Sequence, residues 1–307
     1  MKPFAKYSWG VLAYSILVIL WGAFVRATGS GAGCGSHWPT CNGEIIPRSP
    51  QQETLIEFTH RLSSGLALIL VVVMLVWAYR QYEKGHMVRL GASAAMFFMV
   101  TEALVGAALV LFQWVADDAS LGRVISISVH LVNTFLLLAS LTLTAWWASG
   151  GKRLQIVNRR LLVGGFVIGF IGVLLIGVSG AITALGDTLF PAGSLAEGIA
   201  QDFSPTVHFL IRLRVYHPMI AILTSFYLIF VVLWQYNSSQ ERNIRLPALI
   251  LGSLLLLQLG IGLLNVLLLA PVFMQIIHLL VADLIWITLV LLFAASIQTL
   301  QPSREIG

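Results

Sequence analysis

Residues 9–28 read WGVLAYSILVILWGAFVRAT, an apolar run long enough to cross a membrane. A helix of about 20 apolar residues spans the hydrocarbon core of a bilayer. The run is too long for the apolar part of a signal peptide, which takes about 7–15 residues, and it shows no small-residue cleavage site. We therefore expect a retained membrane-spanning helix near the start of the sequence.

Seven further apolar runs follow. The expected spans cover residues 9–28, 56–79, 91–113, 125–147, 161–184, 209–235, 247–270 and 272–300. Pro271 disfavours helix at the residue before it, so a tight turn is expected between the last two. Of the 307 residues, 58% are hydrophobic and 10% are charged, whereas soluble domains carry roughly 25% charged residues. The sequence predicts an all-α integral membrane protein with eight transmembrane helices.

The lysines and arginines of short loops predict the orientation. With the N-terminus inside, the cytoplasmic cations are Lys2, Lys6, Arg80, Lys84, Arg89, Lys152, Arg153, Arg159, Arg160, Arg242, Arg245 and Arg304. The outer ones are Arg26, Arg48, Arg61, Arg123, Arg212 and Arg214. We expect a multi-pass protein of the cell inner (plasma) membrane with both termini in the cytoplasm. Because the cations form no stripe on one face, the net charge of +5 indicates the lipid bilayer as partner and no nucleic acid.

The chain contains a weak internal repeat. Residues 102–111 (EALVGAALVL) resemble residues 258–267 (QLGIGLLNVL), at an offset of 156. A Gly-Ala pair also recurs in the first and fifth expected helices, at an offset of 158. We expect two tandem pseudo-symmetric four-helix bundles, an N-terminal half over 1–150 and a C-terminal half over 151–307.

Four of the seven histidines lie on the second, fourth, sixth and eighth expected helices, near their outer ends: His60, His130, His217 and His278. An ionisable residue within a span is by default a functional candidate. A lone histidine can simply bond to a neighbouring helix, but four at equal depth favour a shared role. Two opposed imidazoles can supply both axial ligands of a haem iron, whereas zinc takes three or four protein ligands. We expect haem-iron ligation by all four.

Several neighbouring residues fit a haem pocket without requiring one. Glycines that would let helices or a flat macrocycle approach closely are Gly65, Gly106, Gly260 and Gly262. Arginines near the outer boundary, able to pair with propionates or to reach lipid headgroups, are Arg26, Arg61, Arg212 and Arg214. Two further carboxylates within the spans, Glu102 and Asp283, have no evident partner in the sequence.

Glu57 lies three residues before His60, on the same helical face. Its carboxylate could exchange a proton or stabilise a cationic intermediate, or it could be an acid favoured by the helix dipole. Arg214 takes the equivalent place before His217. This difference predicts that the N-terminal half carries out chemistry and the C-terminal half holds a fixed cofactor.

Both cysteines, Cys34 and Cys41, lie in one Gly-rich loop within the outward-facing segment 29–55. An oxidising compartment permits a disulfide there. A disulfide is the favoured interpretation, with free or redox-active thiols as the alternative.

Three segments resemble the first half of the haem A synthase family: VRATGSGAGC at 25–34, WPTCNG at 38–43 and EFTHR at 57–61. The resemblance extends over the whole chain in its eight helices, tandem halves and four histidines. It implies an oxidoreductase that converts haem O to haem A for cytochrome oxidase assembly. The C8 methyl group of haem O would become a formyl group by two successive hydroxylations, the gem-diol then losing water.

The resemblance also implies roles for residues at matching positions. Glu57, His60 and His130 would form the catalytic site around the substrate haem O. His217 and His278 would ligate a permanent haem b that passes electrons, and Cys34 and Cys41 would form an outer-loop disulfide. The implied partners are a haem O synthase and a quinol or another electron donor, and a homo-oligomer is left open.

Two departures from the family pattern fall in the C-terminal half. The loop 185–208 lacks a second cysteine pair, and Pro218 follows His217 where many members have arginine. The main alternative function is a di-haem b-type electron-transfer protein. A transporter with internal repeats fits less well, because no helix shows paired Gly/Pro interruptions at mid-depth.

Overall fold

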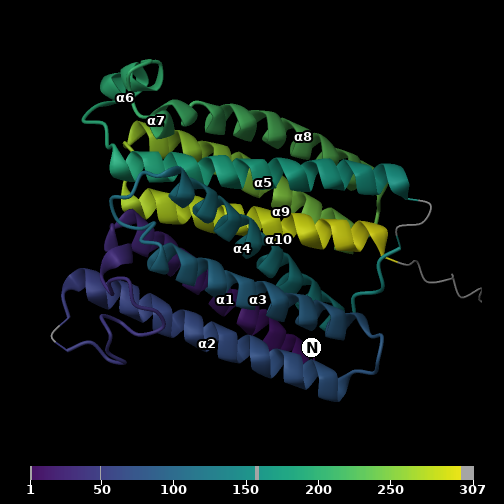
Figure 1. Cartoon of the computed structure of the whole chain (residues 1–307). Coiled ribbons are helices and arrows are strands. Elements are labelled where there is room, and N and C mark those ends of the chain that lie inside the picture. The colour runs from purple at the N-terminus through teal and green to yellow at the C-terminus, as the bar shows by residue number, and fades with distance from the viewer. Residues whose placement is uncertain (1, 49, 156–158, 299–307) are drawn as a thin grey trace, which may run out of the picture.

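A computed structural model describes residues 2–48, 50–155 and 159–298. They form a bundle of long helices lying side by side (Figure 1). The spans are α1 (Pro3–Ala27), α2 (Gln52–Gln81), α3 (Met87–Leu111), α4 (Leu121–Ala148), α5 (Arg160–Leu189), α7 with α8 (Phe209–Leu213 and Tyr216–Ser238), α9 (Arg242–Leu267) and α10 (Val272–Ile297). Eight described segments are long and apolar enough to cross a membrane, so the predicted fold class is confirmed.

The helices extend beyond the apolar runs from which they were predicted. α2 begins at Gln52 rather than at 56, and α9 begins at Arg242 rather than at 247. Polar residues continue the backbone hydrogen bonding of a helix past the apolar segment, so apolar length alone underestimates helix length. The last span was predicted to reach 300, and Arg304 was counted as cytoplasmic; residues 299–307 lie outside the described ones.

The sixth span differs most from the prediction of one helix over 209–235. It consists of α7 and α8, separated at Arg214 and Val215. Pro218 has no N–H to bond the Arg214 carbonyl four residues earlier, and its ring crowds that carbonyl. The carbonyl oxygen of Arg214 instead accepts the backbone N–H of His217 at 3.2 Å. Pro218 thus accounts for the break.

The loop predicted over 185–208 is partly helical. α5 continues to Leu189, and a short helix, α6 (Leu195–Asp202), follows. Ser194 caps α6 by accepting the backbone N–H of Glu197, a favourable N-cap arrangement. A short 3-10 helix, η1 (Ser30–Ala32), lies in the loop that carries the cysteines.

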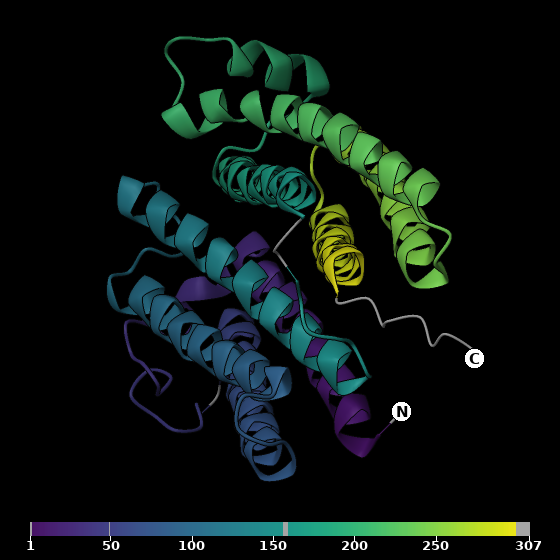
Figure 2. The same cartoon turned by 90° about the vertical axis from the view of Figure 1, so that its right-hand side faces the viewer.

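The helices pack in two groups (Figure 2). Helix α1 packs on α2 and α4, and α3 packs on α2 and α4; likewise α5 packs on α8 and α10, and α9 packs on α8 and α10. The groups meet where α4, and to a lesser extent α1, contact α5 and α10. Half of the apolar window of α4 and of α10 is buried, against 17–28% in the other spans, so these two helices form the centre of the bundle. The tandem repeat and the division at residue 150 stay predictions.

One aromatic contact joins the two central helices. Trp286 of α10 stacks on Phe135 of α4 with ring centres 5.0 Å apart. Its indole Nε1 donates to the Phe135 carbonyl oxygen at 2.6 Å. Spans α2, α4, α7–α8 and α10 all begin at the end of the bundle that carries Cys34 and Cys41, which we call the disulfide end. That this end faces outward stays a prediction.

Candidate functional site

All four predicted histidines lie near the disulfide end. His60, His130, His217 and His278 each fall within the first ten residues of their span. All four are half-buried. The fold therefore brings the four residues to one level of the bundle, two in each group of helices.

Each of these histidines packs against a glycine of the preceding span. A methyl group placed on Gly22 would lie 2.9 Å from Cε1 of His60, and one on Gly180 would lie 2.9 Å from Cε1 of His217. Such contacts are closer than real Cβ atoms make, so a larger residue there must displace the ring. The recurring Gly-Ala pair of the sequence identified Gly22 and Gly180 as equivalent positions, but it did not predict that each contacts a histidine.

The other two histidines have the same arrangement with more space. A methyl group on Gly262 would lie 3.2 Å from Cε1 of His278, and one on Gly106 would lie 3.8 Å from Cε1 of His130. The other two glycines expected to allow close approach, Gly65 and Gly260, have nothing within 4 Å of such a methyl group. No helix of the described chain approaches Gly65 or Gly260 closely, and approach of a macrocycle to them stays a prediction.

The second pair of histidines has a spacing that suits two ligands of one iron. The ring centres of His217 and His278 are 6.3 Å apart and their planes are nearly perpendicular, at 79°. Metal–imidazole nitrogen bonds are about 2 Å long, so two rings on opposite sides of one iron have centres about 6 Å apart. The pair fits axial ligation of a haem.

The ring nitrogens also fit ligand roles. Nδ1 of His60, His130 and His278 is buried and makes no hydrogen bond among the described residues. Nδ1 of His217 lies 3.1 Å from the Ser179 hydroxyl. An unpaired buried nitrogen is costly, so these rings are candidates for a bound group.

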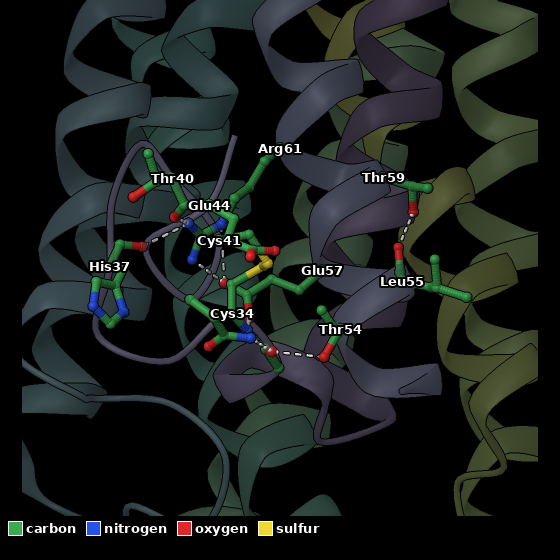
Figure 3. Close-up of a disulfide and its surroundings, with 12 residues drawn as sticks. Cys34, His37, Thr40, Cys41, Glu44, Thr54, Leu55, Glu57, Thr59 and Arg61 are labelled. Carbon is green, nitrogen blue, oxygen red and sulfur yellow. Dashed lines mark hydrogen bonds and ion pairs between the residues drawn. A yellow bond between two sulfur atoms is a disulfide. The ribbon is translucent and has the colours of Figure 1, made fainter. Parts of the chain in front are cut away.

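Glu57 is held by the cysteine loop (Figure 3). Its Oε2 accepts the backbone N–H of Cys34 at 2.7 Å, and its Oε1 accepts Nε of Arg61 at 3.1 Å and also Nη2 of Arg61. Nη1 of Arg61 donates to the carbonyl oxygens of His37 and Thr40, both at 2.6 Å. The carboxylate is buried, so Glu57 and Arg61 together fix this loop beside the helix that carries His60.

Cys34 and Cys41 form a disulfide, as predicted. Both sulfur-bearing residues are fully buried. The backbone of the loop closes on itself, since Asn42 N–H donates to the Cys34 carbonyl at 3.0 Å. The disulfide therefore bounds the segment on which Glu57 and Arg61 converge.

Three of the four arginines proposed for propionates are bound by protein groups. Besides Arg61, Arg214 pairs with Asp187 and Asp202, each at 2.9 Å. Arg26 donates to the Ala184 carbonyl oxygen at 2.8 Å. Arg212 is exposed. The acidic partners of Arg214 lie in the segment predicted to be a plain loop, so sequence reasoning missed them.

Glu102 has partners that the sequence did not reveal. Its Oε2 accepts Nδ2 of Asn133 at 2.5 Å, and its Oε1 accepts the Thr134 hydroxyl. The same Oε1 lies 3.5 Å from Nδ1 of His130. Asp283, in contrast, is fully buried and neither carboxylate oxygen has a hydrogen-bond partner among the described residues.

The remaining histidines serve local structure. The side chains of His86 and His208 accept the backbone N–H groups of Val88 and Leu210 and so cap α3 and α7. His37 lies in the cysteine loop and accepts from Arg61 through its carbonyl oxygen. Within the described residues, no three His, Cys, Asp or Glu side chains gather as a metal cluster would require.

The fold and the paired histidines define a multi-pass α-helical membrane protein with two candidate prosthetic-group sites. The sequence pattern of the family described as cytochrome oxidase assembly protein (COX15-CtaA) matches residues 5–290. The chain belongs to this family, which confirms the resemblance to haem A synthases.

Individual relatives carry two different names. A Thermus thermophilus protein named protoheme IX farnesyltransferase is 51% identical over 303 residues, covering 99% of this chain and 50% of that protein. A heme A synthase of an Exiguobacterium strain is 29% identical over 264 residues, covering 85% of this chain and 82% of that protein. A heme A synthase of Lysinibacillus sphaericus is 43% identical over 124 residues, covering 40% of each chain. The chain thus spans half the length of the Thermus relative.

Proposed function

We propose that the protein is a haem A synthase, an oxidoreductase that converts the C8 methyl group of haem O to a formyl group. The observation that carries the proposal is the set of four histidines, each packed on a glycine of the preceding span, in a member of the cytochrome oxidase assembly family. Each of the two hydroxylations is a two-electron oxidation of the methyl carbon that inserts one oxygen atom. With dioxygen as the source of that atom the protein needs an electron donor, and with water as the source it needs an electron acceptor.

His217 and His278 would hold a resident haem b in the C-terminal half. The 6.3 Å between their ring centres supports this assignment. Such a haem supplies one-electron transfer when bound. Ser179, 3.1 Å from Nδ1 of His217, would orient that ring so that Nε2 is left for the iron.

His60 and His130 would face the substrate haem O in the N-terminal half. Glu57 would act there as an acid/base or charge-stabilising group. Its binding to Cys34 and Arg61 supports a fixed position for the carboxylate rather than a freely moving one. The same contacts give Glu57 a structural part in holding the cysteine loop, so both roles require testing.

The Thermus relative's name favours farnesyl transfer as a second candidate. Half of that protein lies outside the match with this chain, so the named activity can reside in the unmatched part. The Exiguobacterium heme A synthase is matched over 82% of its length. This comparison favours haem oxidation for the present chain. It also supports a haem O synthase as a partner, because the Thermus protein joins a region like this chain to an activity on protoheme.

The proposed setting is the inner membrane, with both termini in the cytoplasm and the histidine sites near the outer face. The inside excess of Lys and Arg supports this orientation. A disulfide at the same end as the histidines supports it as well, since disulfides persist in oxidising compartments.

Pigment analysis in a host that supplies haem O and lacks haem A tests the proposal. We expect haem A to form when the chain is expressed and not when His60→Ala is expressed at the same level. Bound haem without haem A would indicate the di-haem electron carrier instead. In a host lacking haem O synthase, haem O formed on expression would indicate the farnesyltransferase.

A further inference from the structure

A polar cluster lies between α3 and α4 within the membrane span. Nδ2 of Asn133 donates to Glu102 Oε2 at 2.5 Å and to the Phe98 carbonyl oxygen at 2.8 Å. The Thr101 hydroxyl donates to Oδ1 of Asn133 at 2.6 Å. The Thr134 hydroxyl donates to the other carboxylate oxygen of Glu102. Each carboxylate oxygen therefore has a fixed donor, and Glu102 is held in one place.

This carboxylate faces the histidine one turn before Thr134 on the same helix. Oε1 of Glu102 lies 3.5 Å from Nδ1 of His130, just beyond the range of a good hydrogen bond. Nδ1 is buried and has no other partner among the described residues. A small rotation of the ring would complete an Nδ1–H···Oε1 bond. No other group in the described chain is placed to satisfy this nitrogen.

The matching position in the other group of helices holds a neutral residue. Gln258 stands 156 residues after Glu102, in the repeated segment, and also reaches the histidine of the following span. Its Nε2 lies 3.3 Å from Nε2 of His278 and donates to the His278 carbonyl oxygen at 3.1 Å. The two side chains meet different ring nitrogens: the carboxylate of Glu102 faces Nδ1 of His130, whereas the carboxamide of Gln258 lies against Nε2 of His278.

We propose that Glu102 is a positioning residue that accepts the Nδ1–H of His130 and makes His130 a more strongly electron-donating haem ligand than His278. This inference rests on the proposed function, because it takes both histidines as haem ligands. A carboxylate bonded to the outer N–H of a ligating histidine fixes its orientation and raises its basicity. The carboxamide of Gln258 does neither for Nδ1 of His278, which has no hydrogen-bond partner among the described residues. The difference between Glu and Gln at matching positions therefore distinguishes the two sites electronically.

The two proposed sites would then differ in the reduction potential of the haem that each binds. A more basic ligand stabilises the oxidised iron and lowers the reduction potential of that haem. The N-terminal site would bind the more strongly reducing haem, and the C-terminal site the haem of higher potential. This difference in reduction potential would come from Glu102 and Gln258, not from the histidines that ligate the iron.

Spectroelectrochemical titration of the purified, haem-loaded chain tests the inference. In Glu102→Gln we expect the midpoint potential of the N-terminal haem to rise while that of the C-terminal haem stays unchanged. The iron–imidazole vibration of the N-terminal site should shift in the same variant. Glu53→Gln is the matched control, because it removes an exposed carboxylate from the first turn of α2 and should move neither haem.

A second variant keeps the test decisive if Glu102→Gln does not fold. Glu102→Asp keeps the negative charge but draws the carboxylate away from Nδ1 of His130 by one methylene, and it should also raise the potential of the N-terminal haem. If wild-type protein binds haem at both sites and neither variant moves a potential, the inference is overturned and the proposed function stands. If the purified wild-type chain binds no haem in a host that supplies it, the haem assignment itself fails.

Discussion

Arg26 on α1 donates through Nη2 to Oε1 of Gln275 on α10, 249 residues further along the chain, at 2.8 Å. Its Nη1 donates to the Ala184 carbonyl oxygen at 2.8 Å and to the Thr188 hydroxyl at 3.2 Å, both on α5. One guanidinium therefore ties the first span to two helices of the other group.

Arg26→Met should destabilise the junction between the helix groups. Each hydrogen bond to a charged group contributes about 1.5–3 kcal/mol, and this variant loses several while leaving Oε1 of Gln275 without its donor. We expect a lower unfolding temperature in detergent, followed by tryptophan fluorescence, with haem content unchanged below it. Arg48→Met, whose side chain is 91% exposed, is the control. Equal unfolding temperatures for the two variants would contradict the role given to Arg26, and loss of haem in Arg26→Met would favour a propionate contact.

Gly22→Ala should impair haem binding in the N-terminal half. The added methyl group would lie 2.9 Å from Cε1 of His60, so the imidazole must move away from its position. Gly10→Ala is the matched control on the same helix, because nothing lies within 4 Å of its added methyl group. Alanine favours helix over glycine by about 1 kcal/mol, so the control should be at least as stable as the wild type. Absorbance of haem per protein measures the effect, and undiminished haem in Gly22→Ala would refute it.

If His217 and His278 hold a haem b as proposed, His217→Ala should remove it from the purified protein. The variant deletes one of the two proposed ligands, while the Ser179 hydroxyl keeps its hydrogen bond to the Ile176 carbonyl oxygen. His208→Ala is a suitable comparison, because His208 caps a helix and packs on Phe190 and Phe209. The low-spin haem spectrum and the pyridine haemochrome content report the outcome. Full retention of haem b in His217→Ala would show that the assigned ligand is wrong.

Glu57→Ala should block formation of haem A while leaving the low-spin haem spectrum largely intact. It should also lower the unfolding temperature, because removing one partner of a buried ion pair costs about 3–5 kcal/mol. Arg61→Met breaks the same pair but keeps the carboxylate. If Arg61→Met loses activity as fully as Glu57→Ala, the Glu57 carboxylate acts only by holding the cysteine loop in place. If Glu57→Ala loses bound haem, its part is likewise structural.

The membrane-spanning helices could be predicted from the sequence because the length of an apolar run is a local property of the chain. The sequence was also sufficient for the disulfide, since two cysteines at a separation of 7 in a glycine-rich loop have few alternatives. The break before His217 was predictable in principle from Pro218, whose effect on the preceding turn is local. Helix α6 was missed because it is short and not apolar, so it gives no membrane signal.

The surroundings of the site could not be predicted in the same way. The partners of Glu102 come from α4, and those of Arg214 from α5 and α6, so each depends on how helices pack. The glycine beneath each histidine likewise belongs to a different helix. A repeated Gly-Ala pair signals that a small residue is needed but not what it accommodates. Residue types were therefore identified from sequence, and their pairing required the fold.

The stacking of Trp286 on Phe135 also bears on how the protein is made. Phe135 is synthesised 151 residues before its partner, so α4 enters the bilayer with the face that packs on α10 still uncovered. Because α5, α7–α8 and α9 precede α10 in the chain, they are inserted before α10 can cover that face. During this interval the nascent chain depends on the insertion machinery or on lipid to shield α4, and a chain halted before α10 is exposed to quality-control proteolysis.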